Sequence, residues 1–342
     1  MHRALRLTID GSALVHNWRW LQDKAGVPAG AAIKADGYGL GARETMQALH
    51  EGGCRDFFVS TWAEAEELGA VPKDASLVVL HGVGPDDVQA ALASTARPVL
   101  NSAEQVERWK QVGGGRRCDV MIDTGMNRLG LRPDEIACLD RLAIDTLHSH
   151  LACADEDHAL NGKQLQRFRE VASVVEASRY SFANSAGICL GVDYSFDLVR
   201  PGLALYGGVP RREAEGSIRQ VAHVEAQIVQ RRTIRAGESC GYGATSVADE
   251  DTEAAILNIG YADGYLRGFS SKGAAFAGEF ALPVLGRVSM DLISVGCSAA
   301  PELREGDWVE LDYDLPTASE ASGLSQYELL TCLGSRFERR WI

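Results

Sequence analysis

Lys34 stands in a setting that favours amine chemistry. It lies in an apolar, strand-like run, A-A-I-K-A (31–35), and the glycine-rich loop D-G-Y-G-L-G follows it. Apolar surroundings lower the pKa of a lysine, and the neutral amine can then form a Schiff base with a carbonyl group. The alternative is a structural or surface lysine, which is the commoner role of an isolated lysine. Lys34 alone does not decide between these roles.

Two later segments combine glycine with hydrogen-bond donors, as a phosphate site requires. N-S-A-G (184–187) contributes the hydroxyl of Ser185, and R-P-G-L-A-L-Y-G (200–207) contributes Gly202. Glycines such as Gly187 and Gly202 let backbone N–H groups approach an anion closely, although glycine-rich turns alone are a weak signal. A lysine opposite such loops is the arrangement that holds pyridoxal phosphate, because the aldehyde binds covalently and the phosphate electrostatically.

Alternating strands and helices must position these residues. The apolar or β-branched runs are AAIKA (31–35), DFFVS (56–60), SLVVLHG (76–82), RPVLNS (97–102), CDVMID (118–123), IDTLHSHLA (144–152), YSFANS (180–185) and LVRPGLALYG (198–207). Segments with helical spacing separate them, as where Leu14, Trp18 and Leu21 follow the possible cap Ser12. Eight such units predict a (β/α)8 barrel, with an open doubly wound sheet as the alternative. In a barrel, Lys34 and the phosphate loops lie at the C-terminal ends of the strands, where active sites form.

The pattern changes after about residue 215. Runs such as VEAQIVQRRTI and EAAILNIGYA follow one another with Gly and Pro turns and without long helical intervals. We therefore expect two domains, a (β/α)8 barrel over residues 1–215 that binds pyridoxal phosphate and a mostly β domain over residues 216–342. The polar stretch 209–220 is the best candidate for the linker.

Composition narrows the class of protein. The 342 residues are 46% hydrophobic and 24% charged, which is typical of a globular protein, and the net charge of −13 disfavours nucleic acid and anionic membranes as partners. The eight cysteines form no C-x-x-C pair, so we expect reduced thiols and no bound metal. Asp10 interrupts the apolar stretch that a secretory signal needs, and no run approaches the roughly 18 apolar residues of a membrane span. We expect a cytoplasmic protein.

An ordered series of motifs resembles the alanine racemases, which are barrel-type pyridoxal-phosphate enzymes. The matching segments are A-I-K-A-D-G-Y-G-L-G-A (32–42), I-D-T-G-M-N-R-L-G (122–130), H-S-H-L-A-C-A-D-E (148–156), N-S-A-G, R-P-G-L-A-L-Y-G, G-Y-G-A-T (241–245), I-G-Y-A-D-G-Y-L-R (259–267) and G-R-V-S-M-D (286–291). The resemblance covers nearly the whole chain. It implies a homodimer with shared active sites that interconverts L-alanine and D-alanine and supplies D-alanine for peptidoglycan.

The resemblance implies two catalytic bases. Lys34 would bind the cofactor and act as one base, and Tyr242 would reach the opposite face of the substrate Cα from the other subunit. Two bases on two faces explain racemisation. A phenol with an ordinary pKa of about 10 needs a lowered pKa or a strong hydrogen-bond partner for this task. Without the motif, Tyr242 would be interpreted as an aromatic residue in a turn.

The remaining cofactor residues are also implied by the resemblance. They are Tyr38 and Ser185 at the phosphate, Arg200 at the pyridine nitrogen, His150 beside the ring and Arg200, and Asn184 and Gly202 in the phosphate loops. A guanidinium stays protonated and only donates, so the ring nitrogen stays unprotonated and side reactions such as transamination are suppressed. The alternative roles are a salt-bridged arginine and a pair of strand histidines.

Three residues are implied in substrate binding. Arg128 would contact the substrate carboxylate and the cofactor's phenolic oxygen, which suits a planar guanidinium with several donors. Met290 would present its backbone N–H to the same carboxylate from the partner subunit. Tyr261 would narrow the entrance and limit the size of the substrate side chain.

The chain departs from the family pattern at two positions. Many members have a carbamylated lysine that braces the substrate-binding arginine where this chain has Met121. Some members also have a phosphate-binding tyrosine where Ser335 stands here. We therefore expect Arg128 to be held in another way, and the phosphate to depend more on Tyr38, Ser185 and backbone groups.

Other functions remain open on the sequence. A serine or broader amino-acid racemase would use the same machinery with a different pocket. An amino-acid decarboxylase of the same plan is disfavoured by Arg200 and by the G-Y-G-A-T segment. A non-catalytic pyridoxal-phosphate carrier would need no second domain.

Overall fold

The computed structural model of the chain describes residues 3–342, which form two compact units. The barrel unit comprises residues 14–205 and 209–219, and the β unit comprises residues 3–13, 206–208 and 220–342. A domain is a part of the chain that could fold on its own. The domain limits expected from the sequence, 1–215 and 216–342, therefore stay a prediction.

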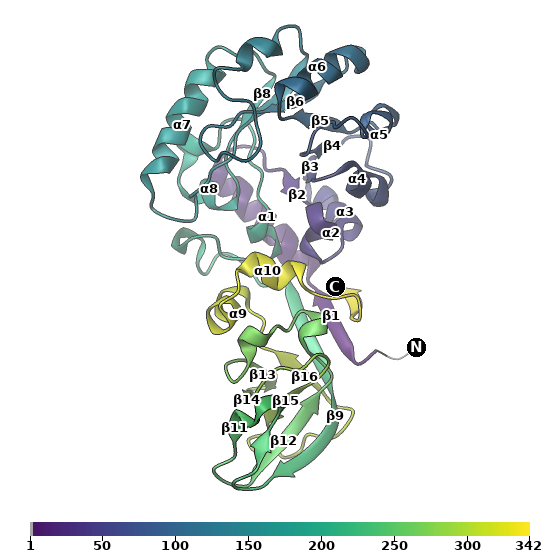
Figure 1. Cartoon of the computed structure of the whole chain (residues 1–342), viewed down its shortest axis with the longest axis vertical. Helices are drawn as coiled ribbons and strands as arrows, with labels where there is room; N and C mark the ends of the chain where they lie inside the picture. Colours follow the sequence, from purple (N-terminus) through teal and green to yellow (C-terminus); the bar gives the residue numbers. More distant parts are fainter. Residues whose placement is uncertain (1–2) are drawn as a thin grey trace. The chain divides into compact units, whose positions relative to one another are not determined.

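A sheet of seven parallel strands forms the wall of the barrel unit (Figure 1). The strands neighbour one another in chain order: β2 (Ala31–Ala32), β3 (Asp56–Val59), β4 (Ser76–Val79), β5 (Arg97–Leu100), β6 (Cys118–Met121), β7 (Ile144–His148) and β8 (Arg179–Ser181). Strands β3 and β6 are buried along their whole length. Burial on both faces is typical of parallel strands that have helices outside and a packed interior.

The eighth expected strand is reduced to a short segment that closes the ring. Leu198 pairs with Ser181 of β8, and Val199 pairs with Ala29, just before β2. Both pairings are parallel. The predicted TIM-like barrel is therefore confirmed, with its last strand shorter than the run 198–207.

Helices follow most strands of the barrel unit and lie outside the sheet (Figure 1). They are α1 (Gly11–Ala25), α2 (Lys34–Tyr38), α3 (Ala42–Gly52), α4 (Trp62–Leu68), α5 (Val88–Ala93), α6 (Ala103–Val112), α7 (Ala159–Ala172) and α8 (Ser185–Cys189), with short 3-10 turns at Ile136–Leu139, Val192–Tyr194, Leu203–Tyr206 and Arg212–Ala214. Leu14, Trp18 and Leu21 of α1 are buried, as their spacing predicts. The residue that caps α1 is Asp10, whose carboxylate accepts the N–H of Ala13 at 2.9 Å.

The interior of the barrel contains an apolar cluster. Phe58, Val78, Val99, Met121 and Leu198 form one buried cluster contributed by different strands. Such a filled centre leaves no pore, and active sites of barrels lie at the C-terminal ends of the strands.

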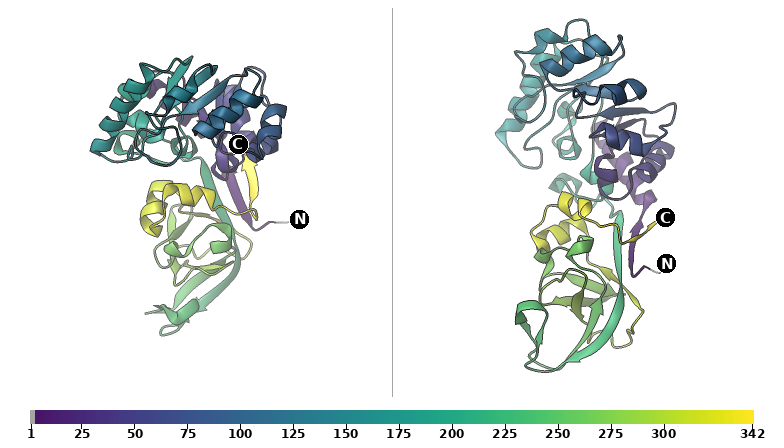
Figure 2. Two further views of the ribbon diagram at one scale, coloured as in Figure 1. Left: turned by 45° about the horizontal axis from the view of Figure 1, so that its top comes forward. Right: turned by 45° about the vertical axis from the view of Figure 1, so that its right-hand side comes forward.

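The β unit is built on an eight-stranded sheet whose central strand is β9 (Ala222–Ile234). The first strand, β1 (Leu5–Ile9), is antiparallel to β9 and parallel to β17 (Glu338–Trp341), so both ends of the chain join this sheet (Figure 2). The other elements are β10 (Ser239–Cys240), β11 (Ser246–Val247), β12 (Thr252–Leu257), β13 (Ala274–Ala277), β14 (Phe280–Leu285), β15 (Ile293–Gly296), β16 (Trp308–Leu311), α9 (Leu315–Ser322) and α10 (Gln326–Thr331), with 3-10 turns at Tyr242–Ala244, Tyr261–Asp263 and Arg267–Phe269. The mostly β character expected after residue 215 is confirmed.

Candidate active site

Lys34 lies where β2 ends, at the start of a left-handed turn. The five residues that follow it have positive φ: Ala35 (52°), Asp36 (51°), Gly37 (61°), Tyr38 (56°) and Gly39 (85°). A left-handed conformation costs roughly 1–2 kcal/mol for each non-glycine residue. The sequence predicted a loop here but gave no sign that Ala35 and Tyr38 would take this conformation.

The surroundings of Lys34 favour its neutral amine. Burial and the positive charge of Arg128 lower the pKa of Lys34, and Glu64 opposes them. A lysine with a lowered pKa is a better nucleophile toward a carbonyl at neutral pH. The structure thus supplies the electrostatic setting that the sequence suggested.

Tyr38, Ser185 and Gly202 meet at the same end of the barrel unit. A Cβ atom on Gly202 would lie 2.2 Å from the Tyr38 hydroxyl oxygen, so only glycine permits this approach. The Ser185 Oγ accepts the N–H of Gly202 at 2.9 Å and the N–H of Ala204 at 3.2 Å. Because Ser185 is the acceptor in both bonds, its own hydroxyl hydrogen remains to be donated to an anion.

Asn184 and Gly187 serve the structure of the loop after β8. The Asn184 side chain accepts the N–H of Gly187 at 2.8 Å and so caps the short helix α8. A Cβ on Gly187 would lie 2.8 Å from Leu151 Cδ1, which explains the glycine by packing. A role of Asn184 in cofactor binding stays a prediction.

Arg200 is a buried guanidinium whose hydrogen bonds go to neutral oxygens. It donates to Ser181 Oγ at 2.5 Å and to the carbonyl oxygen of Ser149 at 2.6 Å. Burial lowers the pKa of Arg200 to about 10, against the opposing charge of Asp119. These bonds fix one side of the guanidinium and leave further N–H donors for a ligand.

A buried histidine–aspartate pair, which the sequence did not predict, lies beside Ser149, the residue whose carbonyl oxygen accepts a hydrogen bond from Arg200. His148 Nε2 and Asp119 Oδ2 are 3.0 Å apart, and both side chains are 0% exposed. Burial lowers the pKa of His148 to about 4, despite the hydrogen bond to Asp119. The sequence pattern H-S-H indicated strand histidines, but the partner Asp119 lies on a different strand and gave no local signal.

His150 and Arg128 belong to the same positively charged region. Burial and the charges of Arg200, Arg128 and Lys34 lower the pKa of His150 to about 3, so its imidazole is neutral. Arg128 is exposed, and its charge acts on both Lys34 and His150. A guanidinium exposed at this place is accessible to an incoming carboxylate.

Met121 does not replace a carbamylated lysine chemically. Its side chain packs in the apolar cluster inside the barrel and is 8% exposed. A thioether is at best a weak hydrogen-bond acceptor, so Met121 gives Arg128 no ionic brace.

Tyr242, Tyr261 and Met290 lie in the β unit. Tyr242 is 67% exposed in a turn that begins after Gly241 (φ 76°), and Met290 is 53% exposed. The loops of Tyr261 and Met290 are joined, because the N–H of Ala262 donates to the Met290 carbonyl oxygen at 3.0 Å. Tyr261 and Met290, to which the sequence gave separate roles, therefore lie on two hydrogen-bonded loops, which we call the Tyr261–Met290 platform.

Arg336, which no sequence motif indicated, joins the two loops of this platform. Its guanidinium binds both carboxylate oxygens of the buried Asp263 at 2.6 and 2.7 Å, and Asp291 at 2.7 Å. Ser335, beside it, is exposed, and its carbonyl oxygen accepts a hydrogen bond from Arg3 at 3.2 Å. The C-terminal segment therefore supports the Met290 loop from within the β unit.

The donor set in the barrel unit suits a phosphorylated aldehyde. Lys34 provides an amine, Ser185 and Tyr38 provide hydroxyl groups beside Gly202, and Arg200 provides guanidinium N–H groups. Within residues 3–342 no group of three or more His, Cys, Asp or Glu side chains could hold a metal ion. None of the helices in that part of the chain is long and apolar enough to cross a membrane.

Fold and site together are typical of parallel-barrel enzymes, with a lysine and glycine-containing loops at the C-terminal ends of the strands. The family models "Alanine racemase, N-terminal domain" and "Alanine racemase, C-terminal domain" match residues 9–210 and 221–341. The chain belongs to the alanine racemase family.

Individual relatives and solved structures agree with this assignment. A catabolic alanine racemase from Agrobacterium fabrum is 41% identical, with 98% of this chain and 92% of the relative covered. The alanine racemase from Rhizobium meliloti is 38% identical over 98% of this chain and 96% of the relative. The crystal structure of alanine racemase from Bartonella henselae, which contains covalently bound pyridoxal phosphate, matches with a TM-score of 0.93 at 35% identity over 100% of both chains.

Proposed function

We propose that this chain is an alanine racemase that interconverts L-alanine and D-alanine with pyridoxal phosphate as its cofactor. Membership of the family gives the reaction class, that of an amino-acid racemase. One observation carries the proposal to this chain's own residues: Lys34, with its lowered pKa, lies just after strand β2, at the same end of the barrel as Tyr38, Ser185 and Gly202.

These residues would hold the cofactor at its two ends. Bound pyridoxal phosphate supplies an electron-withdrawing ring that makes the substrate Cα proton acidic. Lys34 would bind its aldehyde carbon, and the hydroxyl groups of Tyr38 and Ser185 would donate to its phosphate. Arg200, already held by Ser149 and Ser181, would donate to the ring nitrogen with a remaining N–H.

Other residues would place the substrate. The exposed guanidinium of Arg128 would bind the substrate carboxylate through two parallel N–H donors. The Met290 N–H and the Tyr261 ring, which share one platform, would complete the carboxylate site and limit the side-chain pocket. His150 stays neutral and would pack beside the ring without adding charge.

Two bases would move the Cα proton. The Lys34 amine would take or return the proton at one face of Cα, and the Tyr242 phenol oxygen would do so at the other face. Burial and Arg128 favour the neutral, proton-accepting form of Lys34. We expect Tyr242→Phe to keep the cofactor and to impair proton removal from one enantiomer only, whereas Lys34→Ala loses both the cofactor's Schiff-base absorbance and racemisation.

We also propose a homodimer in which Tyr242 and Met290 act on the partner's cofactor. Their exposure of 67% and 53% in the β unit is consistent with residues that a second copy would cover. Val247 and Leu292, which follow these two residues closely in the sequence, are also exposed hydrophobic side chains.

Mixing inactive variants tests the shared site. Lys34→Ala and Tyr242→Phe subunits, unfolded and refolded together, should regain about a quarter of the wild-type activity, because about half of random dimers are mixed and each mixed dimer has one intact site. If Tyr242 acted within its own chain, neither site of a mixed dimer would be intact, and no activity would return.

We place the enzyme in the cytoplasm, where it would supply D-alanine for peptidoglycan. All eight cysteines are free thiols, which is the state that a reducing compartment maintains. Agrobacterium fabrum has both a catabolic and a biosynthetic relative, at 41% and 37% identity. Growth of a strain lacking this chain, with and without D-alanine, would show which role it has.

The reaction itself is tested with purified holoenzyme in deuterated water. L-alanine and L-serine are supplied in parallel, and optical rotation and α-deuterium incorporation are followed. Racemisation with α-exchange fastest for alanine supports the proposal. Preference for serine would change the substrate, release of carbon dioxide would indicate a decarboxylase, and neither exchange nor racemisation would contradict an enzymatic role.

A further inference from the structure

Glu64 binds the backbone directly after Lys34. Its Oε1 accepts the N–H of Ala35 at 2.9 Å, and its Oε2 accepts the N–H of Ser60 at 2.6 Å. Ala35 follows Lys34, and Ser60 follows β3. One carboxylate thus joins the ends of two neighbouring strands.

This use of Glu64 differs from ordinary helix capping. Glu64 is three residues after Thr61, which caps α4 by accepting the Glu64 N–H at 3.2 Å. A glutamate at that position usually returns to the backbone N–H of the cap residue. Here its side chain reaches beyond the helix to Ser60 and to the Lys34 turn.

The two strands need such an acceptor where they separate. The N–H of Ile33 donates to the carbonyl oxygen of Phe58 at 2.9 Å, after which Ala35 and Ser60 both present donors. Two N–H groups cannot bond each other, whereas the two oxygens of a carboxylate can accept both.

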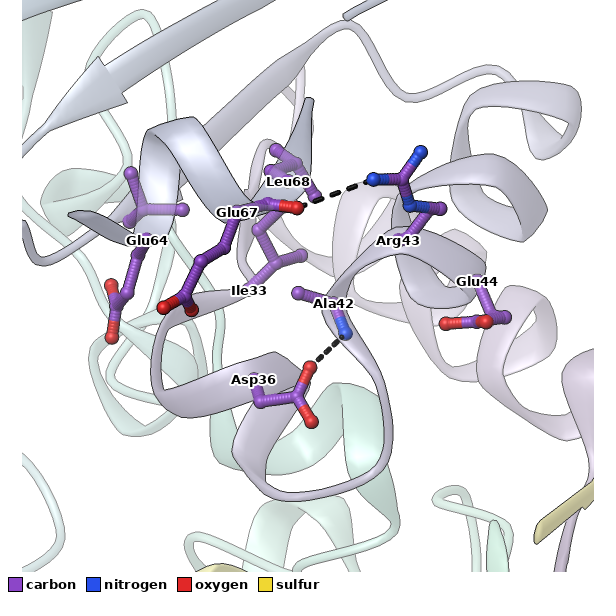
Figure 3. Close-up of a pocket in the computed structure, with 9 residues that line it drawn as sticks. Ile33, Asp36, Ala42, Arg43, Glu44, Glu64, Glu67 and Leu68 are labelled. Carbon is purple, nitrogen blue, oxygen red and sulfur yellow. Dashed lines mark hydrogen bonds between the residues drawn. The ribbon is translucent and has the colours of Figure 1, made fainter. Parts of the chain in front are cut away.

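The left-handed turn also depends on bonds from outside it. Ala35, Asp36 and Tyr38 are non-glycine residues with positive φ, a conformation that persists only where the surroundings fix it. Asp36 accepts the N–H of Ala42 at 2.9 Å and holds the far side of the turn. Figure 3 shows Asp36 with this bond, and Glu64 and Glu67 on α4 at the same pocket.

We propose that Glu64 is a positioning residue for Lys34, which fixes the turn and supplies the negative charge beside the amine. The proposal rests on the proposed function of Lys34 as the cofactor-binding residue. Glu64 itself does not touch the reacting atoms; it acts through the backbone of Ala35 and through its charge.

The charges around Lys34 make this role measurable. Arg128 lowers the pKa of Lys34 and Glu64 raises it, while the charge of Lys34 lowers the pKa of His150. Asp36 is a further charged residue in the left-handed turn. Loss of the Glu64 charge leaves only the effects that lower the pKa of Lys34. The Lys34 nitrogen joined to the cofactor would then lose its proton at lower pH.

Glu64→Gln in the holoenzyme tests the proposal. Glutamine has nearly the same shape, but it has no charge and turns an N–H donor toward one of the two backbone N–H groups. We expect the pH midpoint of the cofactor's visible absorbance to fall by about 0.5–1 unit, and cofactor release during dialysis to accelerate about tenfold. Glu67→Gln is the matched control, because Glu67 is exposed and lines the same pocket on the same helix.

Glu64→Asp separates position from charge. Aspartate keeps the charge but is one methylene shorter, so it cannot bridge both N–H groups. We expect faster cofactor release with a nearly unchanged absorbance midpoint. This variant also serves if Glu64→Gln does not fold, as judged by circular dichroism.

Any of three results would overturn the proposal. The first is a Glu64→Gln holoenzyme with the wild-type absorbance midpoint and release rate. The second is a Glu64→Asp holoenzyme with the wild-type release rate, and the third is a Glu67→Gln holoenzyme whose midpoint shifts as much as that of Glu64→Gln. If the wild-type protein itself shows no Lys34-linked absorbance, the proposed function fails instead, so the two failures are distinguishable.

Discussion

The two ends of the barrel carry opposite arrangements of charge. At the N-terminal ends of the strands, arginines are paired with carboxylates. Arg179 donates to both oxygens of Asp56 at 2.8 and 3.0 Å, and Arg97 lies 3.0 Å from Asp119 and 3.3 Å from Asp145. At the C-terminal ends, Lys34, Arg128 and Arg200 gather around a neutral His150, and Arg200 binds neutral oxygens only.

The pKa values record this difference. Hydrogen bonds and charges of Asp56 and Asp145 raise the pKa of Arg179 despite its burial. Burial lowers the pKa of Arg200 to about 10, because the charge of Asp119 offsets only part of the effect of burial. The N-terminal ends of the strands, here called the paired end, are electrostatically satisfied by the protein itself. Under the proposed function, the C-terminal ends, here called the unpaired end, would be completed by anionic groups of a cofactor and a substrate. Stability and function thus lie at opposite ends of the same strands.

The largest effect on the paired end should come from Asp119→Asn. This substitution removes a fully buried charge from between Arg97 and His148, and breaking a buried pair costs about 3–5 kcal/mol. We expect a loss of that size in the free energy of unfolding measured with urea. Asp193→Asn, which removes an exposed partner of Arg169, is the control and should cost under about 1 kcal/mol. Equal losses in both variants would contradict the distinction between buried and exposed pairs.

Acid should weaken the molecule in two stages. Burial lowers the pKa of His148 to about 4, so as pH falls below 6.5 the unfolded chain gains a proton that the folded chain excludes. Stability should then fall by about 1.4 kcal/mol per pH unit for such a histidine, until the pH reaches the folded-state pKa.

The carboxylates act at lower pH. Burial alone would raise the pKa of Asp56, but the hydrogen bond and charge of Arg179 lower it below 3.8. Its contribution is therefore complete above the unfolded-state pKa and is lost as pH falls through the folded-state value. Urea midpoints measured from pH 8 to pH 3 should show both stages, and His148→Gln should remove part of the first. A first stage of unchanged slope in His148→Gln would assign it to other groups.

At the unpaired end, Gly202→Ala should weaken the cofactor site without unfolding the barrel. The new Cβ would lie 2.2 Å from the Tyr38 hydroxyl oxygen and would displace it from the phosphate loops. We expect about tenfold weaker binding of pyridoxal phosphate, or about 1.4 kcal/mol, by fluorescence titration of the apoprotein. Gly162→Ala, where a Cβ meets nothing within 4 Å, should bind normally. Equal affinity for pyridoxal phosphate in the two variants would show that the Tyr38 hydroxyl group does not contribute to phosphate binding.

The smallest effect should follow Arg117→Ala. Arg117 is 60% exposed and lies 2.9 Å from Asp145, which also contacts Arg97 and Arg179. An exposed pair contributes about 0–1 kcal/mol, and Asp145 keeps its other partners. A loss above about 2 kcal/mol in the free energy of unfolding, measured with urea, would mean that the exposed Arg117 is essential to the charge cluster at the N-terminal ends of the strands.

The sequence predicted the barrel more completely than it predicted the site. The spacing of apolar runs predicted all seven parallel strands, because burial on both faces leaves a local signal. It did not predict β1, whose partners β9 and β17 are distant in sequence. It also extended the first run to residue 35, whereas β2 ends at Ala32 and a left-handed turn begins after Lys34.

Within the site, motifs selected the residues that we propose bind cofactor and substrate, but they did not select the residues that hold those residues in place. Glu64, the Asp119–His148 pair and Arg336 are joined to their partners only by the fold. No spacing rule links Glu64 to Ala35, because the bond crosses from a helix to the end of another strand. The neutral partners of Arg200 were equally invisible, since the sequence suggested a salt bridge or a histidine contact.

The most direct test of the unpaired end is to find the lysine that binds pyridoxal phosphate. The holoenzyme is reduced with borohydride, which makes the bond to the cofactor permanent, and its peptides are mapped by mass spectrometry. We predict the label on Lys34, with loss of label in Lys34→Ala. A label on another lysine, or an unlabelled protein that still racemises alanine, would contradict the central claim that the cationic end of the barrel is the cofactor site.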